Sequence, residues 1–238
     1  MSNLTSKSMS VLGVFILLGL ISLGYFLVES VNVYKEYDRT VSVKGLSQKD
    51  YKADIILWPI KFTTPDKDLF SLNNKIEEYT KLVLDFLEKN GIKKDEINIL
   101  APAITDKMAN DYANKNFQYR YLGNRTINVY SKNVEVVRTA ISKLSQLNKK
   151  GIIFNVNDYN ARIEYIFTRL NEIKPSMIEE STKKAREVAL KFAKDSNSKL
   201  GKIKKARQGQ FSIFDRDKNT PNIKTVRVVS SIEYYLND

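Results

Sequence analysis

The chain has 238 residues and a formal net charge of +12, from 39 Lys and Arg against 27 Asp and Glu. Its hydrophobic share of 42% and charged share of 28% are typical of a globular protein, and they exclude wholesale disorder, collagen and a polytopic membrane protein. The sequence has no Cys and no His, which excludes disulfides, Cys nucleophiles, Ser-His-Asp catalysis and nearly every transition-metal site.

The first expected element is an uncharged stretch from Met9 to Val28. As a helix with a rise of about 1.5 Å per residue, it would cross roughly 30 Å, the thickness of a bilayer core. Lys7 before it and Glu29 after it favour an N-terminus in the cytoplasm. We expect an uncleaved transmembrane signal-anchor. A cleaved signal peptide, which would leave a secreted protein, stays open, although the following VESVNVY contains no small-x-small cleavage site.

This interpretation divides the chain into a cytoplasmic tail (1–8), the anchor (9–28), a connector (29–38) and a periplasmic or extracellular domain (39–238). All but one of the Lys and Arg residues then lie outside the cytoplasm. Nucleic acid is therefore not an expected partner. The absence of thiols is compatible with an oxidising envelope.

Two strands are expected at the start of the domain, over 39–46 and 51–62, joined by a turn at 47–50. In the second strand both faces become apolar toward its end. Pro59 lies within it and has no amide hydrogen to donate. We expect Pro59 at an edge, a bulge or an end of the sheet.

Three amphipathic helices follow in the pattern of apolar residues. The first begins after Pro65, the second near Asn133 as N-cap, and the third at Pro175 in the first helical position. Their inward faces place Phe86 and Phe192 against the sheet. We expect both phenylalanines to be buried.

Glycines are expected to end these helices. Gly91, Gly151 and Gly201 each lie just past a predicted helix, where a left-handed residue is favoured, and each precedes an Ile-containing segment. The pattern indicates either a repeated α/β unit or a coincidence of capping chemistry. The remaining strands are expected over 117–131, 159–167, 203–213 and 225–236, with polar loops at 105–116 and 215–222.

The entry hairpin RTVSVKGLSQKDYKADIILWPIKF resembles the start of the SIMPL (DUF541) domain. A second segment, FTRLNEIKPSMIEESTKKAREVALKFAKDSNSKLGKIKKARQGQFSI, is similar to the same family. The positions that carry this similarity are Leu170, Ile173, Lys174, Pro175, Ala185, Arg186, Phe192, Ala193, Gly201, Gln208 and Gly209.

The resemblance covers essentially residues 39–238 and implies an envelope protein with an α/β fold. For some members it also implies large ring-like homo-oligomers, and it implies no reaction and no catalytic residues. We expect the α+β class: one SIMPL-like domain with an antiparallel or mixed sheet packed by the three helices. We expect no enzymatic activity, no cofactor and no metal. A hydrolase built from Asp, Glu, Ser, Lys or Tyr is the remaining catalytic alternative.

A cluster of basic residues is the candidate site for an anionic partner. It consists of Lys199, Lys202, Lys204, Lys205 and Arg207, with Lys183, Lys184 and Arg186 on the preceding helix. These residues are typical either of a surface for anionic lipid or envelope polymer, or of a solvated helix face and a lysine-protected edge strand. The segment Asp215–Asn219 mimics the start of an EF-hand loop, but Thr220 and Val226 replace its glycine and glutamate, which favours a hairpin tip.

Two functions follow as expectations. The first is a membrane-anchored, non-enzymatic envelope protein that forms a homo-oligomer through its SIMPL-like domain. The second is a monomeric envelope-binding module that docks an anionic polymer, lipid or protein through its basic face. The physiological role, the partner and the subunit number do not follow from the sequence.

Overall fold

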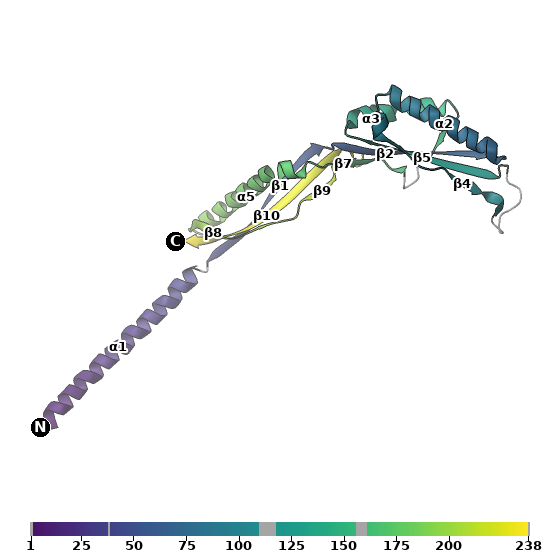
Figure 1. Ribbon diagram of the computed structural model, residues 1–238. Coiled ribbons are helices and arrows are strands. Elements are labelled where there is room, and N and C mark those ends of the chain that lie inside the picture. Colours follow the sequence, from purple (N-terminus) through teal and green to yellow (C-terminus); the bar gives the residue numbers. More distant parts are fainter. Residues whose placement is uncertain (1, 38, 110–117, 156–160, 238) are drawn as a thin grey trace. The chain divides into compact units, whose positions relative to one another are not determined.

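The computed structural model describes residues 2–37, 39–109, 118–155 and 161–237, and the described chain is α+β (Figure 1). It divides into two compact units. Unit 1 contains residues 1–48, 175–212 and 227–238, and unit 2 contains 49–174 and 213–226.

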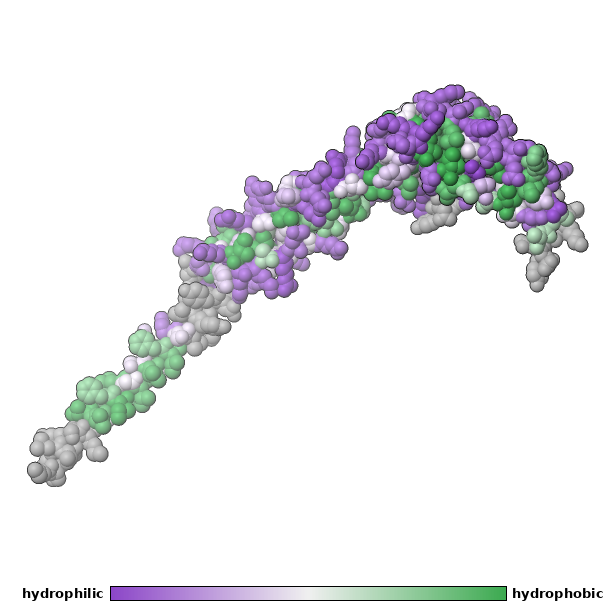
Figure 2. Space-filling view, viewed as in Figure 1, coloured by the Kyte–Doolittle hydropathy of each residue, from purple (hydrophilic) through white to green (hydrophobic). Residues whose placement is uncertain are grey.

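Helix α1 (Ser2–Tyr37) contains one stretch, Ser10–Ser30, that is long and apolar enough to cross a membrane. Its large side chains are exposed, with Phe15 at 69%, and Figure 2 shows the segment as a mainly hydrophobic surface. A helix of this kind near the N-terminus is compatible with a signal-anchor and with a signal peptide. The helix continues to Tyr37 and so includes most of the expected connector.

Unit 1 is built on a sheet with the strand order β1-β10-β8, which we call sheet A. Helix α5 covers one face, where its small residues Ala185 and Ala189 pack against Val43, Ile232 and Tyr234. β9 also pairs with β10. The bounds are β1 (Thr40–Lys52), α5 (Leu170–Asp195), β8 (Lys199–Gln208), β9 (Ser212–Asp215) and β10 (Ile223–Asn237).

The second face of sheet A is uncovered in the described part of unit 1. Along β1, buried Val43 and Gly45 alternate with exposed Ser42, Lys44 and Leu46. In β10, buried residues alternate with exposed Arg227 and with partly exposed residues, and the buried Ser230 shares a hydrogen bond with Ser181 of α5. Because successive strand residues point to opposite faces, the exposed and partly exposed residues that alternate with buried ones in the two strands lie on the face away from α5.

Unit 2 is built on sheet B, in which β5 and β2 are central and antiparallel. Helices α2, α3 and α4 cover one face (Figure 1), where the largest buried side chains include Phe62, Ile60 and Leu87. The bounds are β2 (Ile55–Asp66), α2 (Leu69–Lys89), the 3₁₀ turn η1 (Lys94–Glu96), β3 (Ile97–Ile99), β4 (Ala103–Asp106), the 3₁₀ turn η2 (Lys107–Ala109), β5 (Tyr121–Ser131), α3 (Val134–Ser142), α4 (Ser145–Asn148), β6 (Ile153–Phe154) and β7 (Glu164–Ile166).

The carboxylates of Asp66 and Asp68 stabilise the start of α2. Asp68 is its N-cap and accepts a hydrogen bond from the Ser71 amide at 2.8 Å. Asp66 accepts from Lys75 Nζ at 2.6 Å and from the amides of Lys67 and Asp68. The Lys75 hydrogen bond, followed by that of the Asp68 amide, holds the pKa of Asp66 far below its usual range. The first helix therefore begins shortly after Pro65, as predicted.

Several local predictions are confirmed. On one side, Pro59 pairs with Asn128 of β5. On its other side, residues 55–57 of β2 pair with β7 and residues 62–63 pair with β6, so Pro59 lies at the gap between these two strands. Gly91 and Gly151 have φ of 86° and 87°, the left-handed conformation expected after a helix. Phe86 is 6% exposed.

Other local predictions are wrong. The segment 47–50 is not a turn, because β1 continues through it to Lys52. Pro175 does not begin a helix, since α5 already begins at Leu170. Gly201 lies within β8, and it is Asn197 that takes the left-handed conformation after α5, with φ of 54°. Phe192 is 56% exposed rather than buried.

Two predictions fall partly on positions that are not described. The expected strand over 159–167 is observed as β7 alone, and residues 156–160 lie outside the described residues. The expected polar loop over 105–116 begins with the end of β4 and η2, and its residues from 110 onward also lie outside the described part.

Candidate interaction surface

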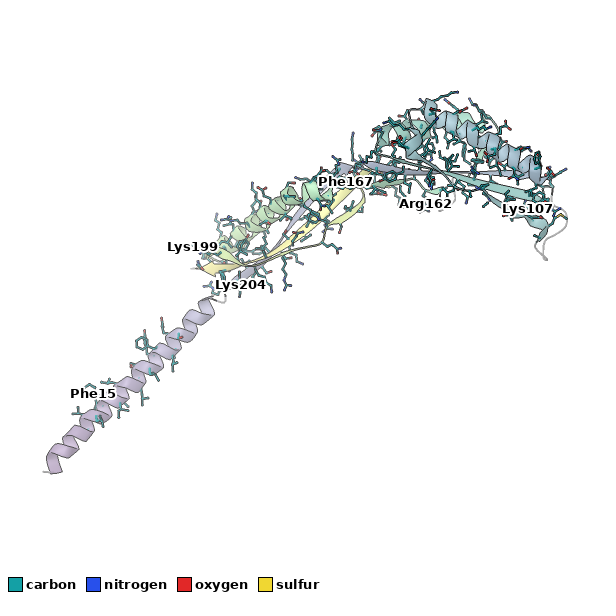
Figure 3. The ribbon with its side chains drawn as sticks, viewed as in Figure 1. Phe15, Lys107, Arg162, Phe167, Lys199 and Lys204 are labelled. Atoms are coloured by element: carbon teal, nitrogen blue, oxygen red, sulfur yellow. The ribbon has the colours of Figure 1, made fainter. Side chains whose placement is uncertain are left out.

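All five basic residues of the candidate cluster lie on β8, which is an edge strand of sheet A. Figure 3 labels two of them, Lys199 and Lys204, near the end of the sheet where the last strand finishes. β8 pairs with β10 in antiparallel register, so Lys199 is opposite Asn237 and Arg207 is opposite Ser231. The register shifts twice along this pairing, which is typical of an irregular edge strand.

The register places several of these side chains on the uncovered face of sheet A. Lys205 is opposite Glu233 and Arg207 is opposite Ser231. Both partners alternate with buried residues of β10 that face α5. Because directly paired residues share a face, Lys205 and Arg207 lie on the face away from α5.

Two further basic residues belong to the same face. Lys44 is exposed between buried Val43 and Gly45, and Arg227 is exposed between buried Val226 and Val228. Neither was predicted from the sequence as part of the cluster, although the alternation of their neighbours indicates their orientation. We use the name basic face for Lys44, Lys199, Lys205, Arg207 and Arg227.

Lys204 has a structural role at this edge. Its Nζ lies 3.9 Å from Glu233 Oε1 and 5.5 Å from the centre of the Tyr235 ring. Thr40 Oγ1 donates a hydrogen bond of 2.9 Å to the same carboxylate oxygen. Glu233 therefore joins β1, β10 and β8, and Lys204 is less available than its neighbours for an external anion. Lys202 is exposed on the same strand.

The basic residues of α5 belong to the opposite side of unit 1. Lys184 Nζ lies 2.7 Å from Glu180 Oε1, and Ser47 Oγ donates to the other oxygen of that carboxylate at 3.0 Å. Burial raises the pKa of Tyr234, and the charge of Arg186 acts against that rise. The structure therefore separates Lys183, Lys184 and Arg186 from the basic face instead of joining them in one cluster.

In the acidic loop after β9, the carboxylate of Asp217 is hydrogen-bonded by residues of the same loop. Asp217 accepts from the hydroxyl of Thr220 and from Arg216 Nε, and the amides of Asn219 and Thr220 both donate to it at 2.8 Å. These bonds, with the Thr220 hydroxyl first, lower its pKa to about 2. Lys224 pairs with Asp215. In the described residues no group of three or more acidic side chains is arranged to hold a metal ion.

Unit 2 has hollows whose linings, among the described residues, do not bring together a set of side chains suited to catalysis. Two of about 350 and 540 Å³ share Leu144 and Phe154 and are mainly apolar. A third of about 280 Å³ lies at the start of α3, beside Lys52 and Lys132. The Glu135 carboxylate at that hollow is engaged by Arg138 at 3.1 Å.

The family model described as SIMPL, protein of unknown function (DUF541), matches residues 41–229. The chain belongs to the SIMPL family. No curated protein matches it. The match begins in β1 and ends in β10, so it spans parts of both units and all the residues of the basic face. Because the SIMPL family is described as being of unknown function, membership in it implies no reaction.

Proposed function

We propose that this SIMPL protein is a non-enzymatic, membrane-anchored envelope protein that self-associates through unit 1. Residues 10–30 hold it in the membrane with the N-terminus in the cytoplasm and both units outside. The observation that carries the proposal is the edge of sheet A at β1. Among the described residues, the outer side of this strand has no partner strand, and it lies beside exposed apolar side chains of α5.

The two edges of sheet A differ in their protection. Among the described residues, β1 pairs with β10 alone, and β8 forms the opposite edge. Edge strands that stay unpaired in natural proteins are usually short, irregular or lysine-rich. β8 has its lysines and two register shifts, whereas β1 runs for 13 residues with Lys44 as the one charged residue between Val41 and Gln48. These features favour β1 as the edge that pairs with another copy.

A row of α5 lies along this edge. Glu180, Lys184, Val188 and Phe192 are spaced by four residues and therefore follow one line along the helix surface. The row begins at β1, because Glu180 accepts the hydrogen bond of Ser47. Val188 and Phe192 are 37% and 56% exposed. A strand added by a second copy at β1 would remove apolar surface of these two side chains from water.

Anchoring supports association because it confines all copies to one membrane, where their effective concentration is high. We expect the protein to remain in the membrane fraction after washing with high salt or carbonate. The mass of the intact purified protein is expected to include residues 1–28. A mature protein beginning near residue 29 would contradict the anchor.

Assembly is tested by the molar mass of the full-length protein in detergent, measured by light scattering with the detergent contribution subtracted. We expect a discrete species that contains several 27.4-kDa protomers. Edge-to-edge pairing between different edges closes into a ring or continues as a filament, and pairing of β1 with itself gives a dimer. A monomer at tens of micromolar would contradict self-association.

A further inference from the structure

We propose that the basic face of sheet A docks on anionic phospholipid headgroups of the membrane that holds α1. The inference rests on the anchor in the proposed function and is independent of self-association. It assigns an occupant to a sheet face that α5 leaves uncovered.

The charge of the two sides of unit 1 differs. The basic face contains five Lys and Arg residues from three strands. The carboxylate of Glu233 on the same face accepts a hydrogen bond from Thr40 and forms an ion pair with Lys204. The segment of α5 in unit 1 has mixed charge, with Glu179, Glu180, Glu187 and Asp195 beside its lysines and Arg186. A negatively charged surface is therefore attracted to the strand side and not to the helix side.

The covalent connection keeps the basic face near the bilayer. Ten residues lead from Ser30, at the end of the apolar stretch, to Thr40, at the start of β1. At most about 3.6 Å per residue, this segment reaches no more than roughly 35 Å, and its helical part reaches less. A short tether of this kind gives an effective concentration in the millimolar range. Headgroups of the same membrane are thus the anionic groups that the face meets most often.

The composition of the face also fits a bilayer surface. Leu46 is 39% exposed between Gly45 and Ser47 on the same strand and adds apolar contact among the charges. Each Lys or Arg close to an anionic membrane strengthens attraction about fivefold, so five of them act as one electrostatic surface. Because the Debye length falls from about 10 Å at 0.1 M salt to about 3 Å at 1 M, this docking is sensitive to salt.

The test uses the full-length protein in lipid nanodiscs made of phosphatidylcholine alone or with 30% phosphatidylglycerol. Lysines are acylated briefly, and the modification at each position is measured by mass spectrometry. With phosphatidylglycerol, we expect acylation of Lys44 and Lys205 to slow by about threefold or more, while Lys183 and Lys191 of α5 react equally in both discs. The protection is expected to disappear in 1 M NaCl.

Matched variants locate the effect. Lys205→Gln with Arg207→Gln should remove most of the protection of Lys44, so that its acylation rates in the two discs become nearly equal, whereas Lys183→Gln with Arg186→Gln, which removes the same charge from α5, should leave the protection unchanged. Equal acylation of Lys44 and Lys205 in the two discs would overturn the proposal, and so would protection of Lys183 and Lys191 instead. Failure of the chain to enter the uncharged discs would overturn the anchor itself, which distinguishes that failure from loss of the lipid preference.

Discussion

Replacing Gly45 with valine is expected to prevent α5 from packing on sheet A. A Cβ at this position would lie 1.8 Å from the carbonyl oxygen of Ser181 and 2.6 Å from the amide nitrogen of Ala185. Both are backbone atoms of the helix, so no side-chain rotation relieves the contact. The helix would have to move away from Val43 and its neighbours, at a cost of about 3 kcal/mol or more.

Thermal unfolding of the full chain, followed by circular dichroism, measures this cost. Ser42→Val is the matched control, because Ser42 lies on the same strand and is exposed on the opposite face. We expect the control to change the free energy of unfolding by at most about 0.5 kcal/mol. An unfolding temperature of Gly45→Val equal to that of the control would show that α5 does not contact β1 in this way.

Phe86→Ala and Phe192→Ala are expected to change the stability of the chain by very different amounts, although both residues lie on helices. Phe86 is 6% exposed and packs in the core of unit 2, so its truncation should cost about 3–5 kcal/mol. Phe192 is 56% exposed, so its truncation should change the stability of the monomeric chain by less than about 1 kcal/mol.

Denaturant unfolding of the two variants under conditions that keep the chain monomeric separates these cases. A large loss of stability in Phe192→Ala would mean that this side chain packs within unit 1 and is not available to a second copy. A small loss in Phe86→Ala would place the core of unit 2 elsewhere.

The local pattern of the sequence predicted much of the fold. The uncharged stretch, the alternation along β1 and β10 and the inward face of α2 are each encoded by neighbouring residues, and all are observed. Pro59 and Gly91 were also placed correctly, since a missing amide hydrogen and a left-handed backbone are properties of one residue.

The wrong predictions involve contacts between distant residues. Ser47 donates to Glu180 and Thr225 donates to Asp50, and these contacts fall where a turn was expected in β1. The Asp54 carboxylate accepts from the amide of Thr168 at 2.9 Å, just before α5, which begins five residues ahead of Pro175. Neither contact has a signature in the local sequence.

The basic site was predicted in part for the same reason. The five residues on β8 were identified because they are close in the sequence. Lys44 and Arg227 join Lys205 and Arg207 only through the pairing of strands far apart in the chain. Conversely, the nearby residues of α5 were grouped with the cluster, although the helix covers the opposite face.

The molar mass of two charged variants tests the central claim most directly. In Phe192→Glu a carboxylate replaces the exposed ring beside the β1 edge, and in Leu190→Glu the same change is made on another side of α5, at a residue that is 49% exposed. Light scattering of the full-length proteins in detergent should give a smaller species, down to the 27.4-kDa protomer, for Phe192→Glu and the wild-type mass for Leu190→Glu. Equal masses for wild type and both variants would contradict assembly through this edge.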